Sequence, residues 1–375
     1  MSLSRQTYEE YFARIKSGDP SKLVVIIDEA QFVAKRDASF MEAVAKLKKH
    51  KLYPGPVLII LATSSTVWAT QEAAEQFKGA EMKIESLNFL EVVRHFESLP
   101  VAEIVRFYGA IGGVPVYLDK WDAAKSFKDN ICRLVLTPSG ALYGEADAVI
   151  SSELRELSAY STILAAIARG ENKLNDIFHA TGFSRAKISV YLKNLANFNI
   201  VEKVVSFETG GWENAKKGVY QIKDTFVNFW FKFVYPNMSN LYLLSPEEFY
   251  DTYIEKELDA YLERYFREVC TEYLLILNQM GQLPFTIKRV GTWIGKTGRI
   301  DIVAQSEDRR SIIGFCNWDK PMMTMDMCEN MAMAMDQARL TSDDYYLFSA
   351  TDFEPALQSY VVRDPRFKLI NMNEL

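Results

Sequence analysis

The sequence predicts a multidomain α/β protein, and three observations support that fold class. In residues 1–90, short β-branched runs alternate with helical stretches, which is typical of a parallel sheet. Residues 91–240 have mainly helical patterns, and residues 241–375 return to a mixture of strands and helices. The 375 residues are enough for several separate cores, and no repeat or low-complexity linker marks the boundaries between them.

The composition is that of an ordinary globular protein, with 49% apolar and 25% charged residues. The net charge of −6 argues against a surface that is basic throughout, although it allows a local basic patch. The apolar runs are too short to span a bilayer, and no signal peptide is recognisable. The four cysteines form no CxxC pair, which indicates neither a zinc site nor a disulfide framework. We therefore expect a cytoplasmic protein without a membrane partner.

The segment "KLVVIIDEAQF" (residues 22–32) has the pattern of a buried strand that ends in two acidic residues. A Walker B strand of an ATPase ends in an Asp that holds the Mg²⁺ of the nucleotide and often a Glu that polarises the attacking water. Asp28 and Glu29 would take these roles, with Asp28 as the magnesium and nucleotide residue. The next strand, "VLIILATSS", ends in hydroxyl residues, and Ser64 is the candidate sensor of the γ-phosphate. A strand that ends in a solvated acidic turn would show the same pattern.

A phosphate-binding loop is expected before this strand, but the preceding residues contain a single glycine, Gly18. Far downstream, Gly295-Lys296-Thr297 resembles the end of such a loop. Only three residues separate Gly295 from Gly291, where the motif needs four, and a strand pattern follows instead of a helix. We therefore expect this tripeptide to form a hairpin turn.

Residues 161–222 have the element order of a winged helix-turn-helix: three helices, then two strands around a glycine-rich turn. Ser184 is expected to cap the third helix, which would present Arg185, Lys187 and Lys193 to the major groove of DNA. The turn between the strands would add Lys216 and Lys217. A winged helix that packs against other protein segments would have the same order, so both interpretations remain open.

The segments "GRIDIVA" and "SIIGFCNWDK" resemble two strands of the PD-(D/E)XK nucleases. In those enzymes acidic residues bind a divalent metal and a lysine helps to activate water. Asp301 takes the position of the metal-binding Asp, and Glu268 that of the acidic residue on the first helix. Phe315 and Asn317 stand where the nucleases have Glu and Lys, which predicts a nuclease-like fold with a vestigial site. Ordinary surface carboxylates would also explain Asp301 and Glu268.

Together these segments resemble the archaeal-type ATPase family of the AAA+/STAND group over nearly the whole chain. The segments "FYGAIGGVPVYLDKWD" and "YSTILAAIARGENKLNDIFHATGFSRAKISVYLKNL" carry the most specific part of the resemblance. The resemblance implies a partial P-loop NTPase sheet (1–90), a helical lid (91–160), a winged helix (161–240) and a nuclease-like α/β domain (241–375). Two departures are the missing phosphate loop and Gly79-Ala80, where the family has Gly-Arg.

These observations predict an N-terminally truncated or degenerate member of that ATPase family. The intact family uses ATP and Mg²⁺, and this chain is expected to bind them weakly and to hydrolyse nothing. The alternative is a non-catalytic scaffold or DNA-binding protein that uses its winged helix. Possible partners are double-stranded DNA and a second copy of the chain. A third possibility, an active nuclease, is disfavoured by Phe315 and Asn317.

Overall fold

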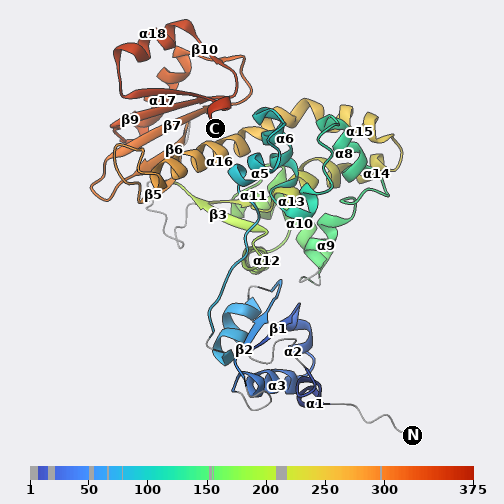
Figure 1. The fold of residues 1–375 in the computed structure, drawn as a ribbon. Helices are drawn as coiled ribbons and strands as arrows, with labels where there is room; N and C mark the ends of the chain where they lie inside the picture. Colours follow the sequence, from blue (N-terminus) through green and yellow to red (C-terminus); the bar gives the residue numbers. More distant parts are fainter. Residues whose placement is uncertain are drawn as a thin grey trace. The chain divides into compact units, whose positions relative to one another are not determined.

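The computed structural model describes residues 7–15, 22–49, 55–65, 67–77, 79–151, 154, 156–207, 218–295 and 298–375. The chain is a mixed α/β protein, as predicted, and it divides into two compact units, residues 1–84 (unit 1) and 85–375 (unit 2) (Figure 1).

Unit 1 is built on two parallel strands. Its elements are α1 (Tyr8–Phe12), β1 (Leu23–Ile27), α2 (Ala30–Ala34), α3 (Ala38–Lys48), β2 (Val57–Leu61), the π-helical η1 (Trp68–Ala73) and α4 (Ala74–Phe77). β1 and β2 pair from Leu23–Val57 to Ile27–Leu61, and the helices α2 and α3 form the connection between them. This arrangement confirms the predicted alternation of parallel strands with helices in this part of the chain.

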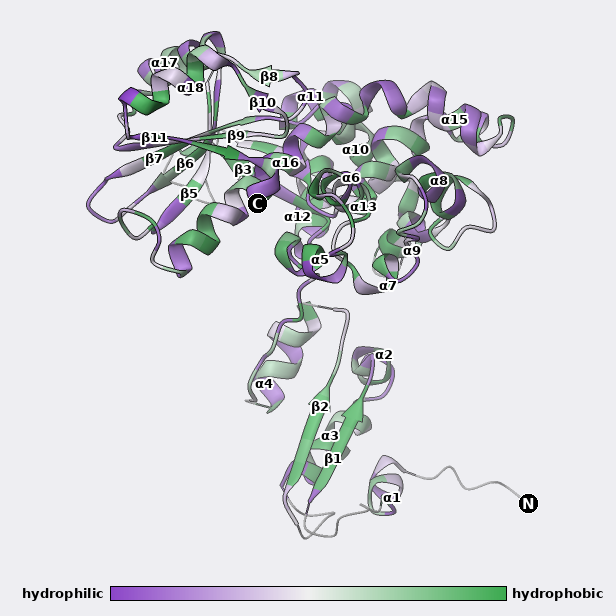
Figure 2. Cartoon of the chain, turned by 45° about the horizontal axis from the view of Figure 1, so that its top comes forward, coloured by the Kyte–Doolittle hydropathy of each residue, from purple (hydrophilic) through white to green (hydrophobic). Residues whose placement is uncertain are grey.

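The two faces of this strand pair differ. Side chains alternate between the faces of a strand, so Leu23 and Val25 pack in the cluster that contains Phe40 and Val44 of α3. The opposite face carries Val24, Ile26, Leu58 and Ile60, which are 52%, 67%, 57% and 42% exposed. Figure 2 shows both strands as strongly hydrophobic ribbons. In the described part of unit 1, helices therefore cover one face of the pair and leave an apolar face open.

Unit 2 begins with a helical region and a two-stranded hairpin. The elements are α5 (Phe89–His95), α6 (Val101–Ile111), α7 (Pro115–Leu118), α8 (Phe127–Ile131), η2 (Cys132–Leu136), α9 (Glu145–Ser151), α10 (Leu157–Ala168), α11 (Leu174–Thr181), α12 (Arg185–Asn197), β3 (Val201–Val205), β4 (Gly218–Ile222), α13 (Thr225–Phe229), η4 (Trp230–Val234), η5 (Tyr235–Asn237), α14 (Met238–Leu241) and α15 (Pro246–Tyr253). β3 and β4 are antiparallel, as the pattern of two strands around a turn predicted.

The "GAIGGVPVY" segment has a structural role at the start of unit 2. The backbone N–H of Leu87 donates to the carbonyl oxygen of Gly113 at 2.9 Å. A Cβ atom at Gly113 would lie 1.8 Å from the carbonyl oxygen of Leu87, so only glycine fits there. Gly112 has a φ of +70°, which again favours glycine. The two glycines therefore allow the chain to enter unit 2 in close contact with the end of α6.

The C-terminal part of unit 2 is a five-stranded sheet in the order β11-β9-β7-β6-β5. Its elements are α16 (Glu255–Gln279), β5 (Arg289–Ile294), β6 (Arg299–Gln305), β7 (Ser311–Asn317), β8 (Met322–Met323), α17 (Met325–Ala338), β9 (Asp344–Ser349), β10 (Asp352–Phe353), α18 (Pro355–Arg363), β11 (Phe367–Asn371) and the 3₁₀ turn η6 (Met372–Glu374). β5, β6 and β7 are antiparallel neighbours, whereas β7, β9 and β11 run parallel. The antiparallel strands β5 and β6 form the expected hairpin, and the backbone N–H of Gly295 donates to the carbonyl oxygen of Gly298 at 2.9 Å. Lys296 and Thr297 lie outside the described residues.

Helices cover both faces of this sheet. On one face, Leu262 and Phe266 of α16 belong to the same cluster as Ile302 of β6. On the other face, Met331 and Met335 of α17 pack in a second cluster with strands β6, β7 and β9. The methionine-rich segment Met325–Ala338 is therefore a helix that packs on the sheet.

The helices of unit 2 share one core with the sheet. A single hydrophobic cluster extends from Phe89 to Met372, because α16 contacts both α6 and the strands β6 and β7. The three predicted boundaries, after residues 90, 160 and 240, each fall inside a helix: α5, α10 and α14. The long helix α16 thus joins segments that the sequence patterns suggested were separate.

α16 has 25 residues but alternates buried apolar side chains with exposed charged ones. Across the described ranges, no helix combines the length and the apolar character needed to cross a membrane.

Candidate functional site

The carboxyl ends of β1 and β2 bring two of the predicted site residues into contact. The hydroxyl group of Ser64 donates to Oε2 of Glu29 at 2.9 Å, and the backbone N–H of Ser64 donates to the same oxygen at 3.2 Å. This contact follows from the parallel pairing, since both strands end at the same edge of the sheet. Thirty-five residues of sequence separate the two side chains.

Glu29 reaches this position through an unusual backbone conformation. Its φ is +48° and its ψ is +43°, in the left-handed region that non-glycine residues rarely adopt. Its backbone N–H donates to Oδ1 of Asp28 at 3.0 Å, which closes the turn between β1 and α2. Strained conformations of this kind cluster at functional sites, so the turn is consistent with a site at this strand end.

Gln31 is a site residue that the sequence analysis did not identify. Its side-chain amide donates to Oε2 of Glu29 at 2.6 Å and to the hydroxyl group of Ser64 at 3.1 Å. The side chain is fully buried, and its Oε1 atom has no partner among the described residues. The signal in the sequence was a polar residue two positions after Glu29, at the start of an otherwise apolar helical turn.

Gln31 and Ser64 together hold Glu29 in its charged form. The hydrogen bond from Gln31, followed by those from Ser64, lowers the pKa of Glu29, while partial desolvation opposes the shift. All of these donors are neutral, so the cluster keeps a net negative charge. We call Glu29, Gln31 and Ser64 the strand-end cluster.

Asp28 lies beside the strand-end cluster and is exposed to solvent. None of the cationic side chains in the described part of the chain pairs with its carboxylate. An exposed carboxylate at a strand end fits a water-mediated contact with a nucleotide-bound Mg²⁺. The phosphates fit less well, because the described glycines of unit 1, Gly55 and Gly79, do not directly precede a helix whose N–H groups would hold them.

The predicted DNA-contacting side chains of α12 are at the surface. Arg185, Lys187 and Lys193 are exposed, and the hydroxyl group of Ser184 accepts the backbone N–H of Lys187 at 3.2 Å, which confirms the predicted helix cap. The turn between α11 and α12 contains Gly182 with a φ of +69°. Lys216 and Lys217 lie outside the described residues.

Arg185 and Lys187 both contact neutral groups. The Arg185 guanidinium lies 4.1 Å from the ring of Phe178 and donates to Oδ1 of Asn175 at 2.5 Å. The Lys187 ammonium lies 4.6 Å from the ring of Phe183. Aromatic rings orient these cations without neutralising them, so their positive charge remains available at the surface.

Asp301 is the predicted vestigial nuclease residue, and its carboxylate accepts hydrogen bonds from two arginines. Its Oδ1 atom accepts Nε of Arg267 at 3.0 Å, and Nε and Nη2 of Arg299 at 3.0 and 2.9 Å. Its Oδ2 atom accepts the backbone N–H of Cys316 at 3.1 Å. The carboxylate is buried, with 8% of the side chain exposed. Guanidinium groups therefore stand where a metal ion would have to bind.

The structure corrects the assignment of Glu268. Its carboxylate accepts Nε of Arg264 at 2.8 Å and does not line the pocket beside Asp301, whereas Glu263 does. The reason is helical geometry: Glu263 precedes Arg267 by four residues and shares its face, while Glu268 is rotated by roughly 100°. Glu268 therefore does not line the pocket of Asp301, although the nuclease-like pattern placed both residues in one site.

The other two nuclease positions have structural roles. The Asn317 amide donates to the hydroxyl groups of Ser349 and Thr351 at 3.0 and 3.2 Å, so it ties β7 to the end of β9. Phe315 packs against the cluster formed by α17. Neither residue offers a metal ligand or a positive charge.

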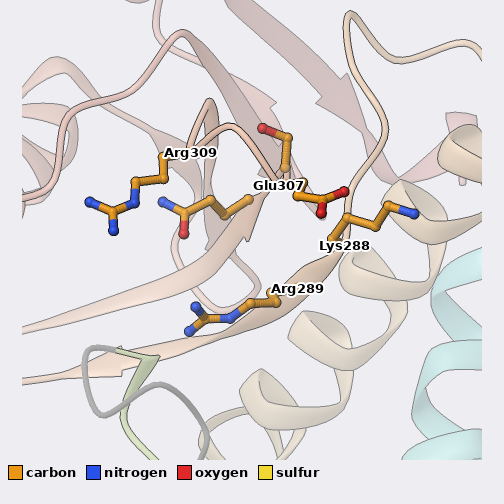
Figure 3. Close-up of a pocket in the computed structure, with 6 residues that line it drawn as sticks. Lys288, Arg289, Glu307 and Arg309 are labelled. Atoms are coloured by element: carbon orange, nitrogen blue, oxygen red, sulfur yellow. The ribbon is translucent and has the colours of Figure 1, made fainter.

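A second pocket, which the sequence did not predict, lies at the edge of the C-terminal sheet. It has a volume of about 480 Å³ and is lined by Lys288, Arg289, Gln305, Ser306, Glu307 and Arg309. Figure 3 shows its charged side chains around one hollow. Within the described ranges, its three cations form no ion pair. We call Lys288, Arg289 and Arg309 the edge cations.

The end of β3 is attached to this edge of the sheet. The hydroxyl group of Ser206 accepts the backbone N–H of Ile294 at 3.1 Å, and Phe207 is buried in the same cluster as Trp293. The Arg289 guanidinium lies 4.8 Å from the ring of Phe207. The β3–β4 hairpin and the edge cations are therefore neighbours within unit 2.

Comparisons with known proteins identify a family region and a homologue. Residues 230–333 match the family model DUF234, described as archaeal and bacterial proteins of unknown function. The uncharacterized protein MJECL04 of Methanocaldococcus jannaschii is 28% identical over 323 residues, which cover 84% of this chain and 71% of that protein. The chain thus contains a DUF234 region and has an archaeal homologue, and neither name indicates an activity.

Among solved structures, the crystal structure of protein VC1899 from Vibrio cholerae aligns with 94% of this chain and 88% of its own chain. The two sequences are 10% identical and the TM-score is 0.24, which is too low to support an argument about fold.

Proposed function

We propose that this chain is a degenerate member of the archaeal-type ATPase family that it resembles, and that it binds ATP weakly and does not hydrolyse it. The observation that carries the proposal is the direct contact of Glu29 with Ser64 at the shared edge of β1 and β2. Catalytic and sensing residues of such ATPases lie at this edge, and here it also has an exposed carboxylate, Asp28. The resemblance of the two strand ends to Walker B and its neighbour supports the same interpretation.

The chemistry at this edge follows from the charges present. When bound with a nucleotide, Mg²⁺ would supply positive charge that offsets part of the charge of the phosphates. Asp28 would hold that ion through water, and Glu29 would orient a water molecule. However, the hydrogen bonds that one Glu29 oxygen accepts from Gln31 and Ser64 lower the pKa of Glu29, which makes the carboxylate a weaker base. Weak binding without turnover is the expected result.

Calorimetric titration with Mg-ATP tests this proposal. We expect a dissociation constant weaker than about 100 μM, and a further loss of binding in Asp28→Ala. Glu75→Ala is the matched control, because Glu75 is an exposed carboxylate of unit 1 on α4. Micromolar binding with measurable phosphate release would show that the chain is an active ATPase. If the parent chain and Asp28→Ala bind Mg-ATP with the same weak affinity, the strand end is not a nucleotide site.

A second candidate function is duplex DNA binding through α12, which the exposed cations favour. Arg185 and Lys187 lie near the start of a capped helix and keep their charge, and Lys193 lies on the same helix. The element order α10, α11, α12, β3, β4 supports a winged-helix interpretation. The edge cations extend the positive surface beside the hairpin.

A mobility-shift titration at several salt concentrations tests this second candidate. Arg185→Ala combined with Lys187→Ala should weaken duplex binding and reduce the salt dependence by about two counterions, because lysine and arginine release counterions from the phosphates. Lys368→Ala, on β11, should leave binding unchanged. If the double variant binds like the parent chain, α12 is a packing helix.

A further inference from the structure

We propose that the pocket beside Asp301 binds the phosphate group of a small or polymeric ligand and not a divalent metal. The pocket has a volume of about 270 Å³ and lies between α16, β6, β7 and the start of α17. It is lined by Glu263, Phe266, Arg267, Arg299, Asp301, Phe315, Cys316, Asn317, Trp318, Asp319, Lys320 and Met327.

The geometry opposes a cation at this place. The Asp301 carboxylate, which would have to be a ligand, already accepts hydrogen bonds from two guanidinium groups and one backbone N–H. A divalent ion bound to this carboxylate would lie a few ångströms from both arginines. Like charges at that distance repel strongly where solvent screening is weak.

Arg267 supplies the positive argument for an anion. Its side chain is only 13% exposed, and its Nε atom is used by Asp301. Its two terminal nitrogens have no acceptor among the described residues, yet they are not sealed from solvent, and Arg267 lines the pocket. Because these nitrogens reach solvent, an anion that enters the pocket would replace water as their acceptor.

Phosphate is the acceptor that this arrangement fits best. A guanidinium presents parallel N–H groups that match two phosphate oxygens. Arg299 donates to the same Asp301 oxygen, and its side chain is 42% exposed. It therefore adds a second guanidinium group to the lining of the pocket. One carboxylate charge shared by two arginines leaves a net charge of +1 for these three side chains.

Two other carboxylates of the pocket weaken the attraction only in part. Asp319 is paired with Lys320 at 2.7 Å. Glu263 is exposed, so solvent screens its charge. Partial desolvation and then Asp319 raise the pKa of Glu263, with Asp301 acting in the same direction and Arg299 and Arg267 opposing the shift. Protonation of Glu263 would remove one repulsion, so anion binding should strengthen as the pH falls.

Calorimetric titration of the full chain with inorganic phosphate tests the proposal, and sulfate is the second probe because its charge does not change with pH. We expect Arg267→Gln and Arg299→Gln each to weaken phosphate binding at least tenfold, since each removes a charge-assisted contact. Glu263→Gln should strengthen sulfate binding at neutral pH and remove its pH dependence. Arg366→Gln is the matched control, because Arg366 is a surface arginine of unit 2 that is paired with Asp364.

Two oligonucleotides, identical except for a 5′-phosphate or a 5′-hydroxyl group, distinguish a nucleic-acid end from free phosphate. Any contribution of α12 cancels in this comparison, so the result does not depend on the DNA-binding candidate. Preference for the 5′-phosphate that disappears in Arg299→Gln would identify the polymeric ligand, and binding of inorganic phosphate alone would identify the small one.

The proposal is overturned if neither anion binds to the parent chain, or if Arg267→Gln and Arg299→Gln both bind the anions as tightly as the parent chain does. It is also overturned if Mn²⁺ binds to the parent chain in a way that Asp301→Asn abolishes. Thermal unfolding checks that each variant is folded. If Arg267→Gln does not fold, Arg299→Gln decides the question, because Arg299 is partly exposed and its removal leaves Asp301 paired with Arg267.

Discussion

Glu29 and Asp301 are both carboxylates held by several donors, but the donors differ in charge. Glu29 accepts from the neutral side chains of Gln31 and Ser64, whereas Asp301 accepts from the guanidinium groups of Arg267 and Arg299. The first cluster keeps its negative charge and suits a cation. The second has become positive and suits an anion. The partners of an acidic residue, more than the residue itself, therefore decide which ligand it fits.

The largest expected effect is on the stability of unit 2. Asp301→Ala should lower the free energy of unfolding by about 3 kcal/mol, because it leaves Arg267 buried without its counterion. Urea unfolding followed by tryptophan fluorescence measures the change. Asp364→Ala is the control, since it removes a surface ion pair with Arg366 and should cost less than about 1 kcal/mol.

Asp301→Asn sharpens this test. The amide keeps an acceptor for the arginines but removes the negative charge, so its effect should lie between those of Asp301→Ala and the parent chain. If Asp301→Ala and Asp364→Ala destabilise the chain equally, the two arginines do not depend on Asp301 in the way proposed.

A smaller effect is expected from the backbone of unit 1. Glu29→Ala and Glu29→Gly both remove the carboxylate, but the left-handed conformation at φ +48° costs alanine roughly 1 kcal/mol more than glycine. We therefore expect Glu29→Gly to be the more stable of the two variants by about 1 kcal/mol in chemical denaturation. The opposite order would mean that the turn after β1 relaxes once the carboxylate is gone.

Some features of the chain were predictable from the sequence because their signals are local. The strand that leads into Asp28-Glu29 and the Ser184 cap are read from adjacent residues, and the structure has both. The pairing of Arg267 with Asp301 was not predictable, since 34 residues separate them and only the packing of α16 on the sheet brings them together. The misplaced Glu268 has the same origin, because the sequence does not indicate which face of α16 meets the strands.

The smallest expected effect is a difference in pH dependence between the two sites. The pKa of Glu29 is lowered on folding from the ordinary 4.5, so its contribution to stability is present above pH 4.5 and is lost as the pH falls through the lowered value. The pKa of Glu263 is raised, so its contribution has the opposite sign: it is present below pH 4.5 and is lost as the pH rises through the raised value.

Glu29→Gln should therefore flatten the loss of stability on the acid side, and Glu263→Gln should flatten the loss toward neutral pH. Thermal unfolding between about pH 3 and 7 measures both slopes, with Glu75→Gln as a control that changes neither. If Glu263→Gln steepened the decline toward neutral pH, the ionised Glu263 would be stabilised by the arginines. The anion site inferred beside Asp301 would then lose its predicted strengthening at low pH.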